Sequence, residues 1–358
     1  MIFNGKLVLE DGSEFRGVLI GAKLAHSEIG EVVFNTSMVG YQEILSDPSY
    51  CDQIICMTYP LIGNYGVSKE FFESRDIFCK GLIVKEICSH PSHFSNNKKL
   101  EDLLKEKDLC GLTNVDTRAL TKKLREHGTI RGMIVSSNKD KEDVIARLKK
   151  TILNKQVEKV SFTGEQIFES VGSTKHVVLF DFGSKNNILE NLKKDYKVTV
   201  VPFNTTYKRI KELDPDGICL SNGPGDPEEL KDVIDVIAKL QDEYPIFGIC
   251  LGHQLLALAN GAKTQKMLYG HRGGNHPVKD LETGRVYISS QNHGYVVTND
   301  SLEGANLIPW FINVNDKTIE GIKVKNKSAI SVQFHPEHCP GPRDTNFLFN
   351  EFFKLMES

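Results

Sequence analysis

The chain has 358 residues, of which 40% are hydrophobic and 25% charged, and its formal net charge is -3 at pH 7. This length exceeds one typical core and fits two domains. The balanced charge gives no electrostatic signature for binding nucleic acid or an anionic membrane, and no window approaches the ~20 apolar residues of a membrane-spanning helix.

The cysteines indicate a reducing compartment. There are eight of them, none forms a Cys-x-x-Cys pair, and a chain of this length needs no disulfides for stability. Cys56 and Cys219 lie within apolar runs, which is typical of buried, reduced thiols that pack as small hydrophobic side chains. We therefore expect a cytoplasmic protein.

The first 150 residues are rich in short strand-like runs. Residues 6–10 and 15–20 flank the turn Asp11-Gly12, which predicts a β-hairpin. Leu120 and Leu124 are spaced four apart and favour one face of a helix over residues 117–126. We also expect a buried strand at residues 81–84 and a short helix at 100–107. These elements predict a smaller N-terminal α/β domain over residues 1–150.

Residues 151–174 are mostly polar, have no clear period and contain Gly164, Gly172 and Ser173, so we expect a linker there. From residue 175 the pattern alternates between strands and helices, and this second domain extends to residue 358. The alternation predicts an α/β fold with an open, mostly parallel sheet covered by helices on both faces. The expected strands are 177–180, 198–201, 217–220 and 246–249, with a helix over 228–240. Ligands bind beyond the carboxyl ends of the strands in such sheets.

The segment with the most chemical information is Gly248-Ile249-Cys250-Leu251-Gly252, between an expected strand and a helical pattern. It is the thiol counterpart of the Gly-x-Ser-x-Gly nucleophile elbow. Glycines two residues either side allow backbone segments to approach closely at a sharp turn. A helix N-terminus favours the thiolate form of a cysteine, and the N–H group after the nucleophile can serve an oxyanion hole. A buried thiol at a strand end is the alternative interpretation.

A cysteine hydrolase also needs a base, and the chain has eleven histidines. The best candidate is His335, because Pro336 favours an extended conformation before it and Glu337 could then hold its imidazole. A surface turn is the alternative. His253, three residues after Cys250, could equally support the helix. We expect no metal site, because His335, His338 and Cys339 lack a second well-spaced ligand group.

A third segment, Ser221-Asn222-Gly223-Pro224-Gly225-Asp226-Pro227, follows an expected strand, with Asp226 as a helix N-cap and Pro227 at the first helical position. It is either a tight turn or a loop whose glycines expose N–H groups to a ligand. It does not match Gly-x-Gly-x-x-Gly, and we find no phosphate-binding loop of the Gly-x-x-x-x-Gly-Lys-Ser/Thr type.

Together, the segments around Cys250, Gly223 and His335 resemble those of triad (class I) glutamine amidotransferases. Other segments narrow the resemblance to the small chain of carbamoyl-phosphate synthase, and it extends over essentially the whole chain. These segments are residues 35–50, beginning Asn35-Thr36-Ser37-Met38-Val39-Gly40-Tyr41, residues 181–188, residues 270–278, beginning Gly270-His271-Arg272-Gly273-Gly274-Asn275-His276, and Gln291-Asn292-His293-Gly294-Tyr295. The N-terminal segment discriminates most, because other amidotransferases carry only the C-terminal half. The chain departs from the family at His338-Cys339, where small residues are usual, and at Tyr295, where Phe is also common.

The resemblance implies that Cys250 attacks the carboxamide of glutamine, with His335 as acid and base and Glu337 orienting it. The backbone N–H groups of Gly223 and Leu251 would face the oxyanion. Glutamine would lie against residues of both domains, since Ser49 belongs to the first. The implied glutamine contacts are Ser49, Gly223, Gly225, Leu251, Gln254, Asn292, Gly294 and Tyr295.

The resemblance also implies a large partner subunit that uses bicarbonate and two ATP to make carbamoyl phosphate for arginine or pyrimidine biosynthesis. ATP and its metal are expected on that partner, with no cofactor in this chain, and ammonia would pass between the subunits. Two alternatives remain. One is a stand-alone γ-glutamyl hydrolase or cysteine peptidase with the same elbow, and the other is a catalytically silent binding module.

Overall fold

The computed structural model describes residues 3–170 and 174–357, and residue contacts divide the chain into two compact units, residues 1–154 and 155–358. The expected linker, residues 151–174, carries two ordered elements, α5 (Gln156–Val160) and β10 (Gln166–Phe168). Strand β10 pairs with β12 (Lys197–Pro202) of the second unit. Residues 171–173 of the expected linker lie outside the described residues.

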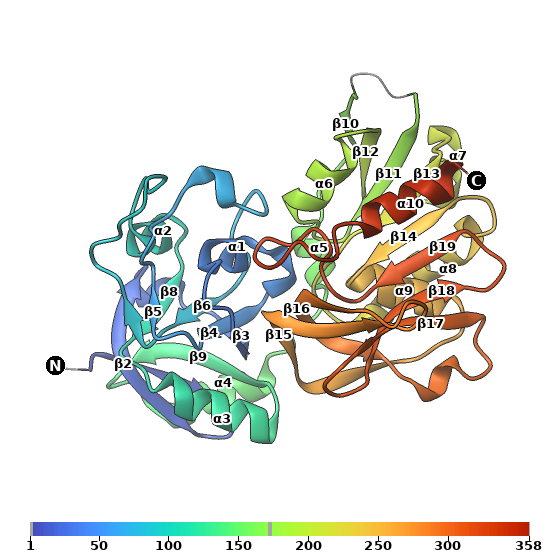
Figure 1. The fold of residues 1–358 in the computed structure, drawn as a ribbon. Helices are drawn as coiled ribbons and strands as arrows, with labels where there is room; N and C mark the ends of the chain where they lie inside the picture. Colours follow the sequence, from blue (N-terminus) through green and yellow to red (C-terminus); the bar gives the residue numbers. More distant parts are fainter. Residues whose placement is uncertain (1–2, 171–173, 358) are drawn as a thin grey trace. The chain divides into compact units, whose positions relative to one another are not determined.

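The first unit is built on a closed barrel (Figure 1). The predicted hairpin is confirmed, because β1 and β2 pair antiparallel with Leu7 opposite Phe15. In order around the barrel the strands are β1 (Gly5–Leu9), β2 (Glu14–Gly21), β8 (Cys110–Thr113), β6 (Gly81–Ile83), β4 (Gln53–Met57), β3 (Ile29–Asn35) and β9 (Ile130–Ser136). Closure pairs each of these barrel strands on both sides, so the described barrel has no free edge.

Helices and short segments surround this barrel. The predicted helix at 117–126 is confirmed as α3 (Thr117–His127), where Asp116 caps the first turn by accepting from the N–H of Ala119. Leu120 and Leu124 pack into the same apolar cluster as the barrel strands. The other elements are α1 (Tyr41–Ser46), α2 (Leu100–Glu106), α4 (Lys141–Lys150), β5 (Leu61–Ile62), β7 (Glu86–Ile87) and the 3-10 turns η1 (Leu24–His26), η2 (Pro48–Tyr50) and η3 (Lys69–Phe71).

The second unit contains one large open sheet with helices on both faces, which confirms the predicted α/β class (Figure 1). Its parallel part holds the four predicted strands and β19, and antiparallel strands extend it on both sides, so the sheet is mixed. The order is β10, β12, β11 (His176–Asp181), β13 (Gly217–Leu220), β14 (Ile246–Ile249), β19 (Ala329–Val332), β18 (Ile319–Val324), β17 (Leu307–Asn313), β15 (Thr264–Asp280) and β16 (Val286–Val297).

Alternating side chains divide the core of this unit into two layers. Along β11, Val178 and Phe180 enter the cluster that includes α7, α8 and α9, whereas Val177 and Leu179 enter the cluster that includes α6 and α10. The remaining elements are α6 (Asn186–Leu192), α7 (Tyr207–Leu213), η4 (Pro227–Glu229), α8 (Lys231–Leu240), α9 (Leu251–Ala259), η5 (Asp300–Leu302) and α10 (Leu348–Glu357). Among the described residues, no helix combines the length and apolar character needed to span a bilayer.

Candidate active site

The predicted nucleophile elbow is present between β14 and α9. Cys250 is the N-cap residue of α9 and has backbone angles φ 54° and ψ -102°, a conformation that side-chain-bearing residues rarely adopt. Its own N–H donates to the carbonyl of Val332 on the neighbouring strand. The strained turn therefore fixes the position of the thiol, which is only 2% exposed.

The flanking glycines are required by space, as predicted. A Cβ atom on Gly248 would lie 2.7 Å from the carbonyl oxygen of Gly252, and one on Gly252 would lie 2.3 Å from that of Leu220. Neither backbone oxygen can move without breaking the turn. The N–H of Gly252 also donates to the carbonyl of Ser221, which ties the elbow to the Ser221–Pro227 loop.

His335 and Glu337 form the predicted imidazole–carboxylate pair. Nδ1 of His335 lies 2.6 Å from Oε1 of Glu337, and because a carboxylate only accepts, Nδ1 carries the proton. Both side chains are buried. The chain turns after Pro336 instead of remaining extended, so the two side chains meet across a turn.

The second ring nitrogen of His335, Nε2, is left for the Cys250 thiol, which interacts with this ring. Nε2 of His335 is buried with no conventional hydrogen-bond partner among the described residues, and the thiol is close enough to change the ring's proton affinity. Burial alone lowers the pKa of His335, but the Glu337 charge and hydrogen bonds with Cys250 and Glu337 outweigh it and raise that pKa. The site therefore favours an imidazolium beside the sulfur.

Lys185 also belongs to the site, although no sequence motif assigns it a role. Its Nζ lies 3.0 Å from Oε1 of Glu337 and donates to the carbonyl of His338 at 2.5 Å. Burial raises the pKa of Glu337, but the charges of Lys185 and His335 lower it overall. Glu337 thus stays ionised between two cations. The sequence did contain an indication that Lys185 belongs to the site, because this residue follows the carboxyl end of β11, where site residues are expected.

Two backbone N–H groups near the thiol are available as oxyanion donors. Those of Gly223 and Leu251 donate no hydrogen bond to the described residues. The two residues are close neighbours, since a Cβ atom on Gly223 would lie 2.8 Å from Cδ2 of Leu251 and 2.4 Å from the carbonyl of Phe182. Only glycine fits at residue 223, because either neighbour would clash with a Cβ atom.

Four further predicted contacts cluster with the elbow in the second unit. The thiol of Cys250 lies 3.7 Å from the carbonyl of Asn292 on β16. Gln254 on α9 donates from Nε2 to the carbonyl of Tyr295 and to Oε1 of Gln333, each at 2.9 Å. Gly294 lies between Asn292 and Tyr295 on β16. These residues form one connected set beside the thiol.

Two predicted contacts are less closely defined. Gly225 has φ +92°, and a Cβ atom there would lie 2.9 Å from Oε1 of Gln156, so this turn requires glycine. Ser49 lies in the first unit, in η2, where its N–H donates to Asp47. The contact of Ser49 with glutamine stays a prediction.

The other histidine and cysteine residues near the elbow have structural surroundings. His253 is fully buried, its Nδ1 lies 2.9 Å from Oγ of Ser331, and burial lowers its pKa to about 3. It therefore stays neutral and supports the helix. Cys339 contacts Nδ1 of His338 at 2.9 Å. In the first unit, burial raises the pKa of Cys56 and of Cys79 to about 12, as expected of core thiols.

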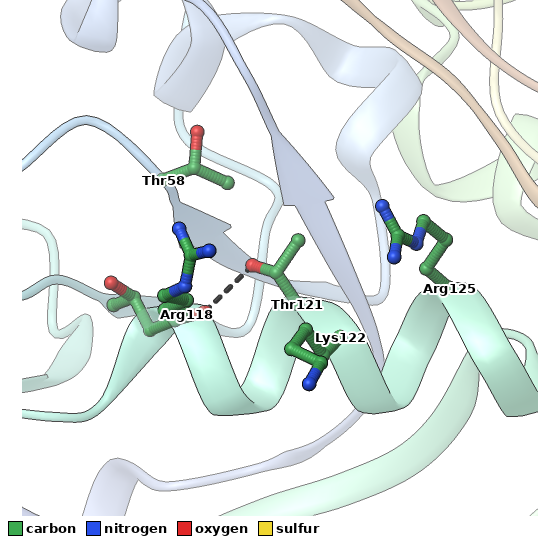
Figure 2. Close-up of a pocket in the computed structure, with 6 residues that line it drawn as sticks. Thr58, Arg118, Thr121, Lys122 and Arg125 are labelled. Carbon is green, nitrogen blue, oxygen red and sulfur yellow. Dashed lines mark hydrogen bonds between the residues drawn. The ribbon is translucent and has the colours of Figure 1, made fainter.

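A separate hollow of about 380 Å³ lies along α3 in the first unit. Figure 2 shows Arg118, Thr121, Lys122 and Arg125 along this helix, with Thr58 from another segment. Its lining offers cations and hydroxyl groups but neither a thiol nor an imidazole. We therefore assign the nucleophilic chemistry to the second unit.

Two family models match the chain in the same division. Residues 7–134 match the model of the carbamoyl-phosphate synthase small chain, CPSase domain, and residues 178–355 match that of class-I glutamine amidotransferases. A carbamoyl phosphate synthase small chain from Fusobacterium nucleatum is 49% identical, with 100% of this chain and 99% of the relative covered. One from Bacillus cereus is 49% identical, with 99% and 96% covered. A solved glutamine amidotransferase from Thermotoga maritima is similar over 52% of this chain and 85% of its own, with 19% identity and a TM-score of 0.39.

The elbow, the imidazole–carboxylate pair and the matching domain model define the second unit as a class-I glutamine amidotransferase domain. The similarity over the full length of the chain identifies a narrower family. The chain belongs to the carbamoyl-phosphate synthase small-chain family and is a glutamine-hydrolysing enzyme subunit.

Proposed function

We propose that this chain hydrolyses L-glutamine through a Cys250 γ-glutamyl thioester and delivers the ammonia to a large, ATP-using subunit that makes carbamoyl phosphate from bicarbonate. The observation that carries the proposal is the Cys250–His335–Glu337 arrangement, with Nδ1 of His335 held by Glu337 and the thiol acting on the same ring. The names of the full-length relatives support the partner.

The first half of the reaction forms the thioester. The thiolate of Cys250 attacks the side-chain carboxamide carbon of glutamine, and the oxyanion that develops accepts hydrogen bonds from the N–H groups of Gly223 and Leu251. Losing one such donor typically costs about 3–4 kcal/mol of transition-state stabilisation. The imidazolium of His335 donates its Nε2 proton to the leaving nitrogen, the C–N bond breaks, and ammonia departs.

The second half restores the enzyme. His335, now neutral, takes a proton from a water molecule that attacks the thioester carbonyl. The C–S bond breaks, glutamate leaves, and the thiolate and imidazolium are restored. Glu337 keeps the ring in one tautomer and stabilises its cation throughout. Lys185 is a positioning residue, because it contacts Glu337 and not the reacting atoms.

The proposed glutamine contacts are those implied by the family resemblance: Ser49, Gly223, Gly225, Leu251, Gln254, Asn292, Gly294 and Tyr295. The neighbourhood of Gln254, Asn292 and Tyr295 beside the thiol supports their inclusion. We further propose that the chain needs no cofactor for hydrolysis, that ATP and its metal bind the partner, that the complex works in the cytoplasm, and that its product serves arginine or pyrimidine synthesis.

The test is Cys250→Ser in the complex with the large subunit. We expect synthesis from glutamine to fall by at least about 10³-fold, since the nucleophile is gone, while synthesis from free ammonia continues. Cys339→Ser is the matched control, because it removes another thiol that is close to His335 and Glu337 in sequence. This variant should retain both activities. Equal loss with glutamine and with ammonia in a folded complex would show that Cys250 is not the glutamine nucleophile.

A stand-alone γ-glutamyl hydrolase or peptidase remains the second candidate, because the elbow and the triad geometry suit any acyl transfer from a γ-glutamyl group. It predicts steady turnover of γ-glutamyl peptides by the isolated chain. The full-length relatives favour the synthase subunit. Comparing glutamine with γ-glutamyl peptides, with and without the large subunit, separates the two candidates.

A further inference from the structure

A second buried cluster of chemically active side chains lies in the antiparallel part of the second unit's sheet. His271 on β15, His293 on β16 and Glu320 on β18 are 7%, 5% and 0% exposed. One potential ligand atom from each residue lies within 4.8 Å of the other two. His271 and His293 are direct partners in the β15–β16 ladder. The proposed hydrolysis of glutamine uses none of the three.

The surroundings of His293 leave one ring nitrogen facing this cluster. Its Nδ1 lies 2.8 Å from the carbonyl oxygen of Tyr295, and because a carbonyl only accepts, Nδ1 must carry the proton. Nε2 is then a lone-pair acceptor. It is buried and has no hydrogen-bond partner among the described residues.

His271 is arranged in the same way. Its Nε2 lies 2.7 Å from Oδ2 of Asp316, which fixes the proton on Nε2 and orients the ring. Its Nδ1 is buried without a hydrogen-bond partner among the described residues and lies 3.5 Å from Oε1 of Glu320. Two ligands held about 2.0–2.2 Å from a tetrahedral zinc ion lie about 3.3–3.6 Å apart. The observed separation agrees with that value.

The carboxylate of Glu320 is also held by neighbours. Oε2 accepts from Nε2 of Gln291 and Oε1 accepts from Nδ2 of Asn313, each at 2.9 Å. Protein metal sites have this second layer, in which each ligating imidazole donates its other N–H to a carboxylate or carbonyl and each ligating carboxylate is itself hydrogen-bonded.

The alternative to a metal ion between these groups is a proton on Nδ1 of His271 that is donated toward Glu320. Burial lowers the pKa of His271, but the hydrogen bond to Asp316 and the charges of Asp316 and Glu320 raise it and so favour such a proton. However, 3.5 Å to Glu320 is long for a charge-assisted hydrogen bond, which is usually about 2.7–2.9 Å. A proton there also leaves Nε2 of His293 without a partner. One divalent cation would satisfy all three groups.

We propose that His271, His293 and Glu320 bind a divalent transition-metal ion, with Zn²⁺ the best match, through Nδ1, Nε2 and a carboxylate oxygen respectively. Two imidazoles and one carboxylate form a donor set that Zn²⁺ takes, with a fourth position left for water. The ion would join β15, β16 and β18 and hold β16 beside Cys250, whose thiol meets the carbonyl of Asn292. This site departs from the expectation of no metal, and it does not depend on glutamine hydrolysis.

The test measures Zn²⁺ on the purified full chain after treatment with a chelator and readdition of the metal. Elemental analysis, calorimetric titration and the visible absorption of a Co²⁺-substituted sample report stoichiometry, affinity and coordination. We expect one Zn²⁺ per chain in the unmodified protein, and thermal unfolding at a higher temperature when Zn²⁺ is present. His271→Asn and Glu320→Gln should lose the ion, and Asp316→Asn should weaken its binding about 10–100-fold.

His276→Asn is the matched control, because its ring lies 5.2 Å from that of His271 on the same strand but is outside the ligand set. It should keep one Zn²⁺ per chain. Circular dichroism establishes that each variant is folded. The proposal is overturned if the unmodified chain takes up no Zn²⁺, if folded His271→Asn binds it as tightly, or if His276→Asn loses it equally.

Discussion

Two histidine–carboxylate centres lie in the same unit, and they differ in what the second ring nitrogen meets. Each has a buried histidine with one nitrogen fixed by a carboxylate, at 2.6 Å for His335–Glu337 and 2.7 Å for His271–Asp316. The other nitrogen of His335 faces the Cys250 thiol, which can give it a proton. That of His271 lies 3.5 Å from a carboxylate oxygen of Glu320 and close to the His293 ring, and it has no hydrogen-bond partner in the described part of the chain.

The difference separates proton transfer from cation binding. An oriented imidazole beside a weak acid can move a proton, and an oriented imidazole beside other acceptors can share a cation with them. The carboxylate that orients the ring is common to both centres, so it does not identify function. The group that faces the second ring nitrogen distinguishes the two functions.

The largest expected effect comes from making the same substitution, histidine to asparagine, separately in each of the two centres. His335→Asn should lower kcat for glutamine hydrolysis by about 10²–10⁴-fold, because the acid and base of the reaction is lost. His271→Asn should have a much smaller effect, because that ring does not contact the thiol. Glutamate release by the purified complex measures both. Equal losses in two folded variants would remove the distinction between the centres.

Breaking the cation–carboxylate contact behind the triad should mainly reduce stability. Lys185→Met leaves Glu337 buried without its ammonium partner, and such a change typically costs about 3–5 kcal/mol. Denaturant unfolding measures the free energy. Lys354→Met is the control, because its pair with Glu351 is exposed on both sides and should contribute about 0–1 kcal/mol. Similar losses in the two variants would contradict a buried ion pair at Lys185.

Neutralising the orienting carboxylate should change the pH dependence of hydrolysis. The Glu337 charge raises the pKa of His335, so the imidazolium persists as the pH rises and is lost only at alkaline pH. In Glu337→Gln that pKa should fall, and the alkaline limb of the kcat/KM profile should move to lower pH while kcat decreases. An unmoved limb would mean that another group controls it. The stability that the His335 proton contributes should likewise be lost at a lower pH.

The smallest expected effect concerns His253. Ser331→Ala removes the 2.9 Å contact to its Nδ1 and should cost about 1–3 kcal/mol, because a buried polar group is left unpaired. The cost should be the same from pH 5 to 8, because burial lowers the pKa of His253 to about 3. Denaturant unfolding at several pH values tests this. A cost that varied with pH would show that His253 titrates in this range.

The sequence predicted those parts of the molecule that depend on local pattern. The elbow at Cys250, the hairpin of β1 and β2, and the helix α3 follow from glycine spacing, a turn dipeptide and helical periodicity. The thiol, imidazole and carboxylate found by motif are brought together by the structure, and their chemical roles stay proposals, as does the expected cytoplasmic location. Strand–helix alternation predicted the α/β class of the second unit.

Features that depend on distant pairing were not predictable in this way. Closure of the N-terminal barrel joins β1 to β9, more than 100 residues away, and nothing local signals that contact. The long β15–β16 ladder and its two register shifts likewise depend on tertiary pairing. Glu320 meets its partners from remote segments and had no local motif to reveal it, whereas Lys185 was marked only by its position after the carboxyl end of β11.

The backbone angles of Cys250 have a consequence for how this protein changes under selection. A side chain held at φ 54° and ψ -102° costs roughly 1–3 kcal/mol that the surrounding structure must offset. Glycine tolerates positive φ without that strain. Selection for heat resistance alone is therefore expected to favour chains with glycine at residue 250. Such chains would gain thermal stability and lose the reactive thiol, so the two properties are opposed at this position.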